Sequence, residues 1–443
     1  MIVALAWFPQ NALQPGVRPR EVWGWALYDF ANSGFTTVVI TAVFNAYFVG
    51  VVAGGADWAT LAWTLTLGVS SALVMLTMPA LGAHTDAHRS KKRWLLVSTV
   101  GCIAGTLALA WCGPGDFVLA VVAVVMANLF FSWGESLIAS FLPELARPEA
   151  MGRVSGWGWS LGYLGGMLAL GLSLGYVLWA QAQGQTASQF VPVTMVITAV
   201  VFALAAVFTF AWLHERGAGP ASAGAAIDPT PARRTTLRET AADLLQRPEH
   251  RSFLWLMGCA CAYQAGISVV IALAAVYAEQ AMGFGQTQTM ALIFLVNIAA
   301  AAGAFAFGYF QDRIGHRRAL SFTLWGWVGM TLLAVAAQGP ALFWVAAVLA
   351  GLCMGSSQSA GRAMAGLLAP SERVAEFYGL WTFATRLAAI VGPITYGLVT
   401  WLTSGNHRLA ILSTGLFFVV GLLLLRPVRL PPHGNVTPAA AGR

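Results

Sequence analysis

Two acidic residues stand inside apolar stretches of the first half of the chain. Asp29 and Glu135 each belong to a polar stripe at helical spacing, whose other members are Asn32, Ser33 and Thr36 for the first and Asn128, Ser132 and Ser136 for the second. A charge in the middle of a helix that crosses a bilayer costs roughly 2.5–3.5 kcal/mol, so each acid needs a polar cavity or a partner. Either acid could bind a proton or an ammonium group, or close a structural ion pair, and the residues leave both interpretations open.

The second half carries the complementary charge. Arg362 and Arg386 lie within apolar stretches, and Gln358 precedes Arg362 by one helical turn, while Tyr263 and Gln264 add polar groups to another stretch. If both halves turn these side chains toward one cavity, carboxylates would hold an ammonium and guanidiniums a carboxylate, so the ligand would be a zwitterion. The alternative is a set of salt bridges that keeps one conformation closed. Arginines near helix ends often lock gates, which slightly favours this alternative for the two arginines.

One glycine- and charge-rich motif occurs twice. Its first copy contains Gly82, Asp86 and Arg89, and its second contains Gly308, Asp312, Arg313, Gly315 and Arg317, with the two aspartates 226 residues apart. The glycines permit a tight turn and close backbone approach, and the aspartate can cap a helix or pair with the basic residues. The repeat predicts two related halves, with the motifs in the loops after the second and eighth helices.

The composition of the chain indicates that these residues lie in helices that cross a lipid bilayer. Of 443 residues 58% are hydrophobic and 9% are charged, against roughly 25% charged in soluble domains. A helix needs about 20 apolar residues to cross a bilayer. Windows of this length predict an all-α membrane protein with twelve transmembrane helices in two pseudo-symmetric six-helix bundles, at 23–52, 58–82, 94–112, 117–140, 155–180, 191–213, 253–279, 287–310, 319–337, 341–365, 377–402 and 407–425.

The hydrophilic stretches divide the chain into five segments. We expect an N-tail at 1–22, a first bundle at 23–213, a linker at 214–252, a second bundle at 253–425 and a C-tail at 426–443. The linker begins as a flexible Ala/Gly/Pro-rich segment. It then offers a short amphipathic helix with Leu237, Leu244 and Leu245 toward one side.

The basic residues report orientation rather than a nucleic-acid partner. With the N-terminus inside, 21 of the 24 Lys and Arg lie in the tails or in the loops after even-numbered helices. This asymmetry follows the positive-inside rule and predicts an inner-membrane protein with both termini in the cytoplasm. The net charge of +7 is therefore explained without nucleic acid.

The polar chemistry elsewhere argues against an enzyme. All 7 histidines lie in loops, tails or helix ends, and no nucleophile–base pair or metal-ligand spacing is present. All 5 cysteines fall in apolar helices, which favours packing over disulfides. We therefore expect no metal, no cofactor and no catalytic residue.

The repeated motif resembles the cytoplasmic loop motif of the major facilitator superfamily, in which it latches a gate between conformations. Other segments resemble the vacuole-effluxer branch of autophagy-related permeases and its bacterial relatives. These are Tyr28-Asp29-Phe30-Ala31-Asn32-Ser33, Phe141-Leu142-Pro143-Glu144, Gly152-Arg153-Val154-Ser155-Gly156 and Glu376-Phe377-Tyr378-Gly379. The resemblance implies a twelve-helix fold and amino-acid efflux. Two features depart from that branch: Ala265 stands where helix 7 usually carries an acid, and Ile138-Ala139 replaces a Tyr-Asn pair.

We therefore expect a monomeric secondary active transporter that moves a small solute by alternating access in a lipid bilayer. Amino-acid efflux is the expected activity, and protons are the expected coupling ion because Asp29 and Glu135 are the acids well inside helices. Two alternatives stay open. One is a transporter-like receptor or scaffold without flux, and the other is a permease for another solute class.

Overall fold

The computed structural model describes residues 8–216 and 243–431, without the side chains of 273–276, 279–281, 286 and 287. Within these ranges 12 helices are long and apolar enough to cross a bilayer, which confirms the number predicted. The α-helices, which besides the long ones include the four-residue α2 and α6, are α1 (Pro19–Gly34), α2 (Phe44–Tyr47), α3 (Ala59–His88), α4 (Lys91–Ala108), α5 (Phe117–Ala139), α6 (Leu142–Leu145), α7 (Met151–Ala182), α8 (Ala187–Trp212), α10 (Arg251–Met282), α11 (Gln286–Ile314), α12 (His316–Ala336), α13 (Pro340–Leu368), α14 (Val374–Leu402) and α15 (His407–Leu425).

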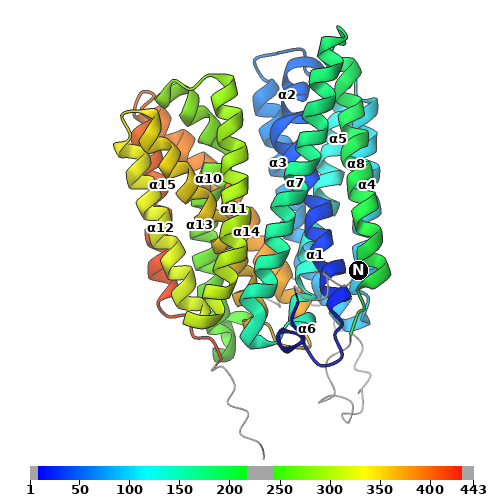
Figure 1. Cartoon of the computed structure of the whole chain (residues 1–443), viewed down its shortest axis with the longest axis vertical. Helices are drawn as coiled ribbons and strands as arrows, with labels where there is room; N and C mark the ends of the chain where they lie inside the picture. Colours follow the sequence, from blue (N-terminus) through cyan, green and yellow to red (C-terminus); the bar gives the residue numbers. More distant parts are fainter. Residues whose placement is uncertain (1–7, 217–242, 432–443) are drawn as a thin grey trace, which may run out of the picture.

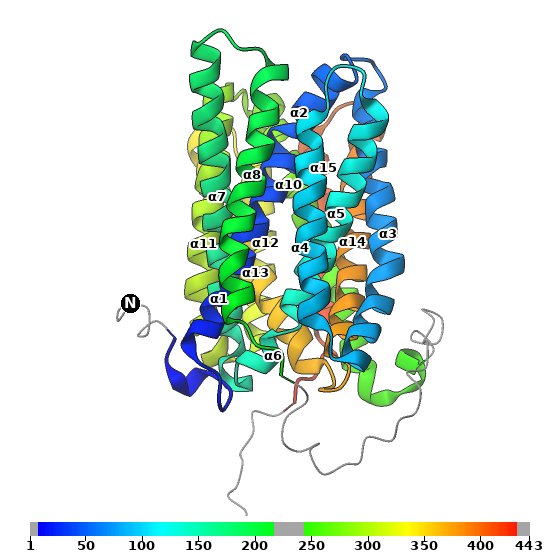
Figure 2. The ribbon, with the colours of Figure 1, turned by 90° about the vertical axis from the view of Figure 1, so that its right-hand side faces the viewer.

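The helices form two bundles that stand side by side (Figure 1). The first contains α1 to α8 and the second α10 to α15, and each has its own buried apolar clusters. We call the end of the molecule that holds Phe8–Arg18 and Arg426–Pro431 the tail end; it lies at the bottom of Figure 1. Figure 2 shows α1 inside the first bundle, where it packs against α7 and α8.

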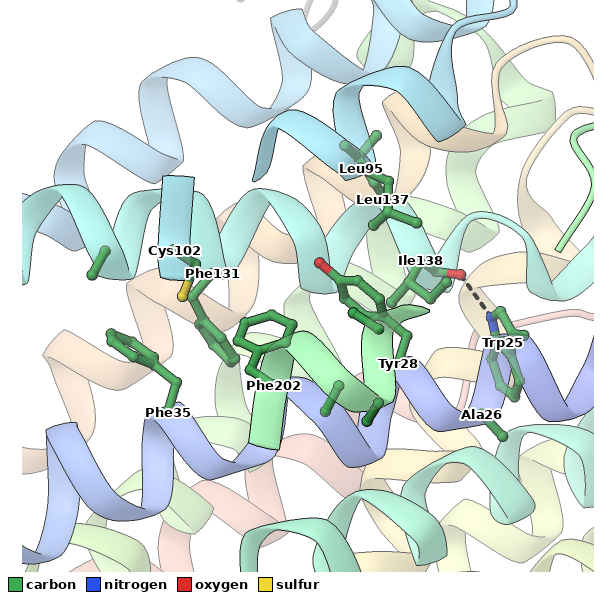
Figure 3. Close-up of a cluster of buried hydrophobic side chains, with 14 of the residues drawn as sticks. Trp25, Ala26, Tyr28, Phe35, Leu95, Cys102, Phe131, Leu137, Ile138 and Phe202 are labelled. Carbon is green, nitrogen blue, oxygen red and sulfur yellow. Dashed lines mark hydrogen bonds between the residues drawn. The ribbon is translucent and has the colours of Figure 1, made fainter. Parts of the chain in front are cut away.

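Aromatic side chains fill the core of the first bundle (Figure 3). The Trp25 indole donates a hydrogen bond of 2.7 Å to the Ile138 carbonyl, which fixes α1 to the end of α5. The Tyr28 ring packs edge-on against Phe202, and its hydroxyl lies 3.0 Å from that of Thr99. Because these polar tips are satisfied, large aromatics can be buried here without loss of hydrogen bonds.

The first span is not a uniform α-helix. After Gly34 the residues Phe35–Ala42 form a π-helix, and α2 and a second π segment, Phe48–Val52, complete the span. The run of β-branched residues crowds the preceding turn, and the Thr41 hydroxyl donates to the Thr36 carbonyl, five residues earlier. Side-chain bonds of this kind compete with the regular helical ladder, which accounts for the altered winding.

The repeated motifs lie at the predicted helix junctions, but only part of each motif forms the turn. Gly82 and Asp86 belong to the last turns of α3, and Gly308 and Asp312 to those of α11. Apolar length alone predicts where the bilayer core ends, whereas the helices continue beyond it. The turns themselves are made at Arg89, with φ 47°, and at the equivalent Gly315, with φ 90°.

Part of the linker lies within the described residues. Positions 243–246 are helical, whereas 217–242, which include Leu237, lie outside the described residues. Leu244 is buried and Leu245 is 75% exposed. The expectation that these two leucines face the same side is therefore wrong.

Small residues let helices of the two bundles touch. A Cβ at Gly308 would lie 2.8 Å from the Gly152 carbonyl oxygen, and one at Gly379 would lie 2.8 Å from that of Met78. These pairs join α11 to α7 and α14 to α3, which are the main contacts between the bundles. All of these positions lie in the tail-end part of their helices, so the bundles close against each other there.

Candidate functional site

Asp29 and Arg362 form a buried ion pair between the bundles. One Asp29 carboxylate oxygen lies 2.6 Å from a terminal nitrogen of Arg362, and the two side chains are 9% and 8% exposed. Arg362 also donates from Nε to the Ser155 hydroxyl at 3.1 Å and from Nη2 to the Ser155 carbonyl at 2.8 Å. Trp25 and Trp159 lie against the guanidinium, with ring centres 4.8 and 5.3 Å from its carbon. The guanidinium is thus held on all sides.

Gly158 makes room for this pair. A Cβ at this position would lie 2.6 Å from an Arg362 nitrogen and 2.6 Å from an Asp29 carboxylate oxygen. Ser33 supports the same turn of α1 by donating to the Asp29 carbonyl at 2.7 Å. Gly158 therefore packs against the ion pair itself.

Glu135 and Arg386 form a further ion pair between the bundles, with 2.9 Å between oxygen and nitrogen. This pair is far more open, because the Glu135 side chain is 41% exposed and that of Arg386 is 19% exposed. Arg386 Nε has no hydrogen-bond partner among the described residues. Glu135 also interacts electrostatically with Asp29 and Arg362. The four residues therefore form one group, which we call the charge cluster.

The hydrogen bonds and ion pairs that join the bundles lie between the tail end and the charge cluster. Arg386 is 12 residues into α14, which places it about 18 Å along that helix from the tail end. At a similar height the Tyr163 hydroxyl donates to Gln358. Closer to the tail end lie the Ser155–Ser359 and Trp157–Tyr309 hydrogen bonds. Among the described residues no hydrogen bond or ion pair joins the bundles beyond the charge cluster, and Figure 1 shows the ribbons diverging there.

Other residues predicted for the site lie elsewhere. Asn128 is buried and donates to the Ser70 hydroxyl at 2.8 Å, which ties α5 to α3 inside the first bundle. Tyr263 is fully buried in the core of the second bundle, and the adjacent Gln264 is partly exposed. Asn32 is buried at 5% exposure. The predicted polar groups that reach between the bundles are thus Asp29, Glu135, Gln358 and the two arginines.

The two motif aspartates hold the tail end closed in equivalent ways. Asp312 accepts from the backbone amides of Gly152 and Arg153, at 2.8 and 3.2 Å, where α7 begins. Asp86 accepts from the amide of Glu376 at 2.9 Å, where α14 begins. Each carboxylate thus lies at the positive end of a helix of the opposite bundle, where an anion is stabilised.

The basic residues of the motifs contribute less than predicted. Arg89, Arg313 and Arg317 are exposed, and none forms an ion pair within the described chain. Lys91 instead bridges Asp86 at 3.4 Å and Glu144 at 2.9 Å. Sequence analysis did not single out this buried lysine, although it belongs to the basic run after the first motif.

The end of the linker also contacts the closed tail end, at the start of α14. Arg373 pairs with Asp243 at 2.6 Å and with Glu376 at 2.8 Å. The hydrogen bond from Arg373 holds the pKa of the Asp243 carboxyl below its usual range, and the bonds to Glu376 and Asp243 raise the pKa of Arg373. The end of the linker is therefore tied to the first turn of α14, which Asp86 caps.

The twelve candidate membrane spans and the likeness to known proteins identify a transporter of the major facilitator superfamily. The chain belongs to the vacuole effluxer Atg22-like family, whose model matches residues 49–431. It is 24% identical over 409 residues to the MFS-type transporter YxiO of Bacillus subtilis (strain 168), which covers 90% of this chain and 93% of that protein.

Solved structures share the fold. The human organic anion transporter MFSD10 (TETRAN) superposes with a TM-score of 0.73 at 16% identity, covering 93% of this chain and 100% of that one. A bacterial homologue of the iron transporter ferroportin in its outward-facing state gives 0.68 at 13% identity, covering 92% and 98%. The proton:xylose symporter XylE gives 0.69 at 14% identity, covering 93% and 95%.

Proposed function

We propose that the protein is a secondary active transporter that exports amino acids or closely related zwitterions by alternating access. The observation that carries this proposal is the difference between the two ion pairs. Asp29–Arg362 is sealed, with side chains 9% and 8% exposed, whereas Glu135 is 41% exposed opposite Arg386. A solute that enters between the bundles therefore meets an acid and a base that are both accessible.

The Glu135–Arg386 pair fits a zwitterion. The substrate carboxylate would replace Glu135 on the Arg386 guanidinium, which has an unsatisfied Nε, and the substrate ammonium would replace Arg386 on Glu135. Each protein charge then exchanges one partner for another, so neither is left buried and unpaired. A solute with only one of the two charges would leave a protein charge without a partner.

Alternating access requires the tail end to open. This movement breaks Asp29–Arg362 and withdraws Asp86 and Asp312 from the helices that they cap. Protonation of Asp29 would weaken its attraction to Arg362 and make opening easier. We propose that protons drive transport in this way, through Asp29 and Glu135.

The distribution of basic residues supports a proposal for the orientation and the location of the protein. With 21 of 24 Lys and Arg on the tail side or in the tails, we place the tail end in the cytoplasm and the protein in the inner membrane. The structure would then represent an outward-facing state of a monomer. The linker 214–252 would join the bundles 23–213 and 253–425 on the cytoplasmic side.

Flux measurements test the proposal. Purified protein in proteoliposomes should exchange labelled neutral amino acids, and an imposed pH step should drive their net movement. Asp29→Asn and Glu135→Gln should both abolish the response to the pH step. Arg408→Gln should not, because Arg408 lies in the first turn of α15, at the end of the molecule opposite the tail end. The absence of flux for amino acids, organic anions and sugars alike would instead support a scaffold without transport.

A further inference from the structure

In the first bundle a carboxylate of the protein itself binds the backbone amides at the start of α4. The Glu215 carboxylate, in the segment that follows α8, accepts from the backbone amides of Lys91 and Lys92 at 2.8 and 3.1 Å. These are the first residues of α4, which packs beside α8. The carboxylate satisfies amides that the helix leaves unpaired and lies at its positive end.

The second bundle has the equivalent place without the carboxylate. Lys91 and Lys92 correspond to Arg317 and Arg318, at the start of α12, with the same spacing of 226 residues as the motif aspartates. The segment after α15, Arg426–Pro431, takes the position of the Glu215 segment, and it contains Arg426 and Arg429 but no acid. Within the described chain, no carboxylate accepts a hydrogen bond from the amides of Arg317 or Arg318.

A cavity of about 420 Å³ occupies this place. It is lined by Ile314, Gly315, His316, Arg317, Arg318, Ser321 and Leu430. Arg317 and Arg318 are exposed and form no ion pair within the described residues. Guanidinium groups, a serine hydroxyl and the start of a helix together form the kind of environment that binds phosphate.

The surroundings favour a lipid as the source of that phosphate. The cavity lies where two membrane spans meet at the tail end, between Ile314 and His316. Phe310 and Phe322 pack against each other beside it, and they are 41% and 59% exposed. An acyl chain can lie along these rings while the headgroup occupies the cavity. A soluble phosphate would use only the polar part of this surface.

We propose that the junction of α11 and α12 is a binding site for an anionic phospholipid, with the headgroup phosphate held by Arg317, Arg318 and the first amides of α12. In the first bundle Glu215 already occupies the equivalent position at the start of α4. The proposal concerns a surface remote from the charge cluster and does not depend on which solute is transported.

Lipid binding to the full-length protein in detergent tests this site. Native mass spectrometry counts bound lipids, and thermophoresis gives the Kd for phosphatidylglycerol and for phosphatidylcholine. We expect phosphatidylglycerol to bind more tightly, and Arg317→Gln/Arg318→Gln to weaken it about tenfold or more, since each basic residue near an anionic surface contributes roughly fivefold. The matched control is Arg20→Gln/Arg89→Gln, which changes two exposed arginines of the first bundle and should alter the Kd less than twofold.

A second variant guards against indirect effects. Leu430→Glu places a carboxylate in the lining of the cavity, and it should displace phosphatidylglycerol; the thermal unfolding temperature, measured alongside, shows that the variant is folded. Equal binding of the two lipids, or an unchanged Kd in both the arginine variant and Leu430→Glu, would overturn the proposal. Displacement of the lipid by millimolar inorganic phosphate would also overturn it, because it would identify a site for soluble anions.

Discussion

The carboxylate of Asp29 lies 2.6 Å from the guanidinium of Arg362, although the two residues are 333 positions apart in the chain. The pair joins the first helix of one bundle to the fourth long helix of the other. It is also the most enclosed contact of the charge cluster, with Ser155, Trp25 and Trp159 completing the shell around Arg362. Any conformation that opens the tail end must separate these two charges.

Removal of one partner should therefore open the gate. Breaking a buried ion pair by deleting one charge costs about 3–5 kcal/mol, because the other charge is left uncompensated. We expect Arg362→Gln to shift the population toward the state open at the tail end. A cysteine introduced in place of Ser359, which is buried in the closed state and whose carbonyl accepts a hydrogen bond from Ser155 of the other bundle, should become reactive to a membrane-impermeant thiol reagent applied from the tail side.

The reverse charge pair provides the control for this experiment. Asp29→Arg/Arg362→Asp restores opposite charges and should return the cysteine at position 359 toward its protected state. If the single variant leaves the engineered cysteine as protected as in the parent, Asp29–Arg362 does not hold the gate.

The open pair of the charge cluster should behave differently. Arg386→Gln removes the proposed carboxylate ligand, and we expect it to weaken substrate binding about tenfold to a hundredfold, in line with roughly 1.5–3 kcal/mol for a charge-assisted hydrogen bond. Because Arg386 is 19% exposed and near the open side, its loss should alter the protection of the tail end less than Arg362→Gln does. Equilibrium binding and the thiol assay on the same samples distinguish a role in substrate binding from a role in closing the tail end.

The motif aspartates should contribute comparable amounts to gate closure. Each accepts amide hydrogen bonds at the start of a helix in the opposite bundle, an interaction that contributes about 0.3–2 kcal/mol. Asp86→Asn and Asp312→Asn should each raise the reactivity of the cysteine at position 359 severalfold, and the double variant should raise it further. Reactivity that responds to only one of them would show that the two gates are not equivalent.

The turn at Arg89 should be strained. Arg89 adopts φ 47°, whereas the equivalent residue of the second motif is Gly315, with φ 90°. The left-handed conformation costs a residue with a Cβ roughly 1–2 kcal/mol. Arg89→Gly should therefore raise the unfolding temperature in detergent, whereas Gly315→Ala should lower it. A decrease in the unfolding temperature on Arg89→Gly would show that the arginine side chain contributes more than its backbone conformation costs.

Sequence alone could identify the charge cluster but not its pairing. Asp29, Glu135, Arg362 and Arg386 are conspicuous because charges are rare inside membrane helices. Which acid faces which base depends on how helices far apart in sequence meet, and apolar periodicity does not encode that. The same limit explains Asn128 and Tyr263, which are polar residues in apolar helices but are buried within single bundles.

The repeat of the motif aspartates was predictable, but their hydrogen-bond partners were not. The spacing of Asp86 and Asp312 indicated two related motifs, yet their partners are backbone amides of Glu376, Gly152 and Arg153. Any residue except proline offers such an amide, so no side-chain pattern marks it. The contribution of Ser155, which binds Arg362 through both its hydroxyl and its carbonyl, escaped prediction for the same reason.

Recognition of a zwitterion by Glu135 and Arg386 is the central claim, and binding of blocked substrates tests it most directly. The measurement compares the Kd of a neutral amino acid with those of its methyl ester and its N-acetyl derivative. We predict that either block weakens binding to the parent protein about tenfold or more, that Arg386→Gln no longer discriminates against the ester, and that Glu135→Gln no longer discriminates against the N-acetyl derivative. Equal binding of all three compounds to the parent protein, or discrimination that survives in both variants, would contradict the account.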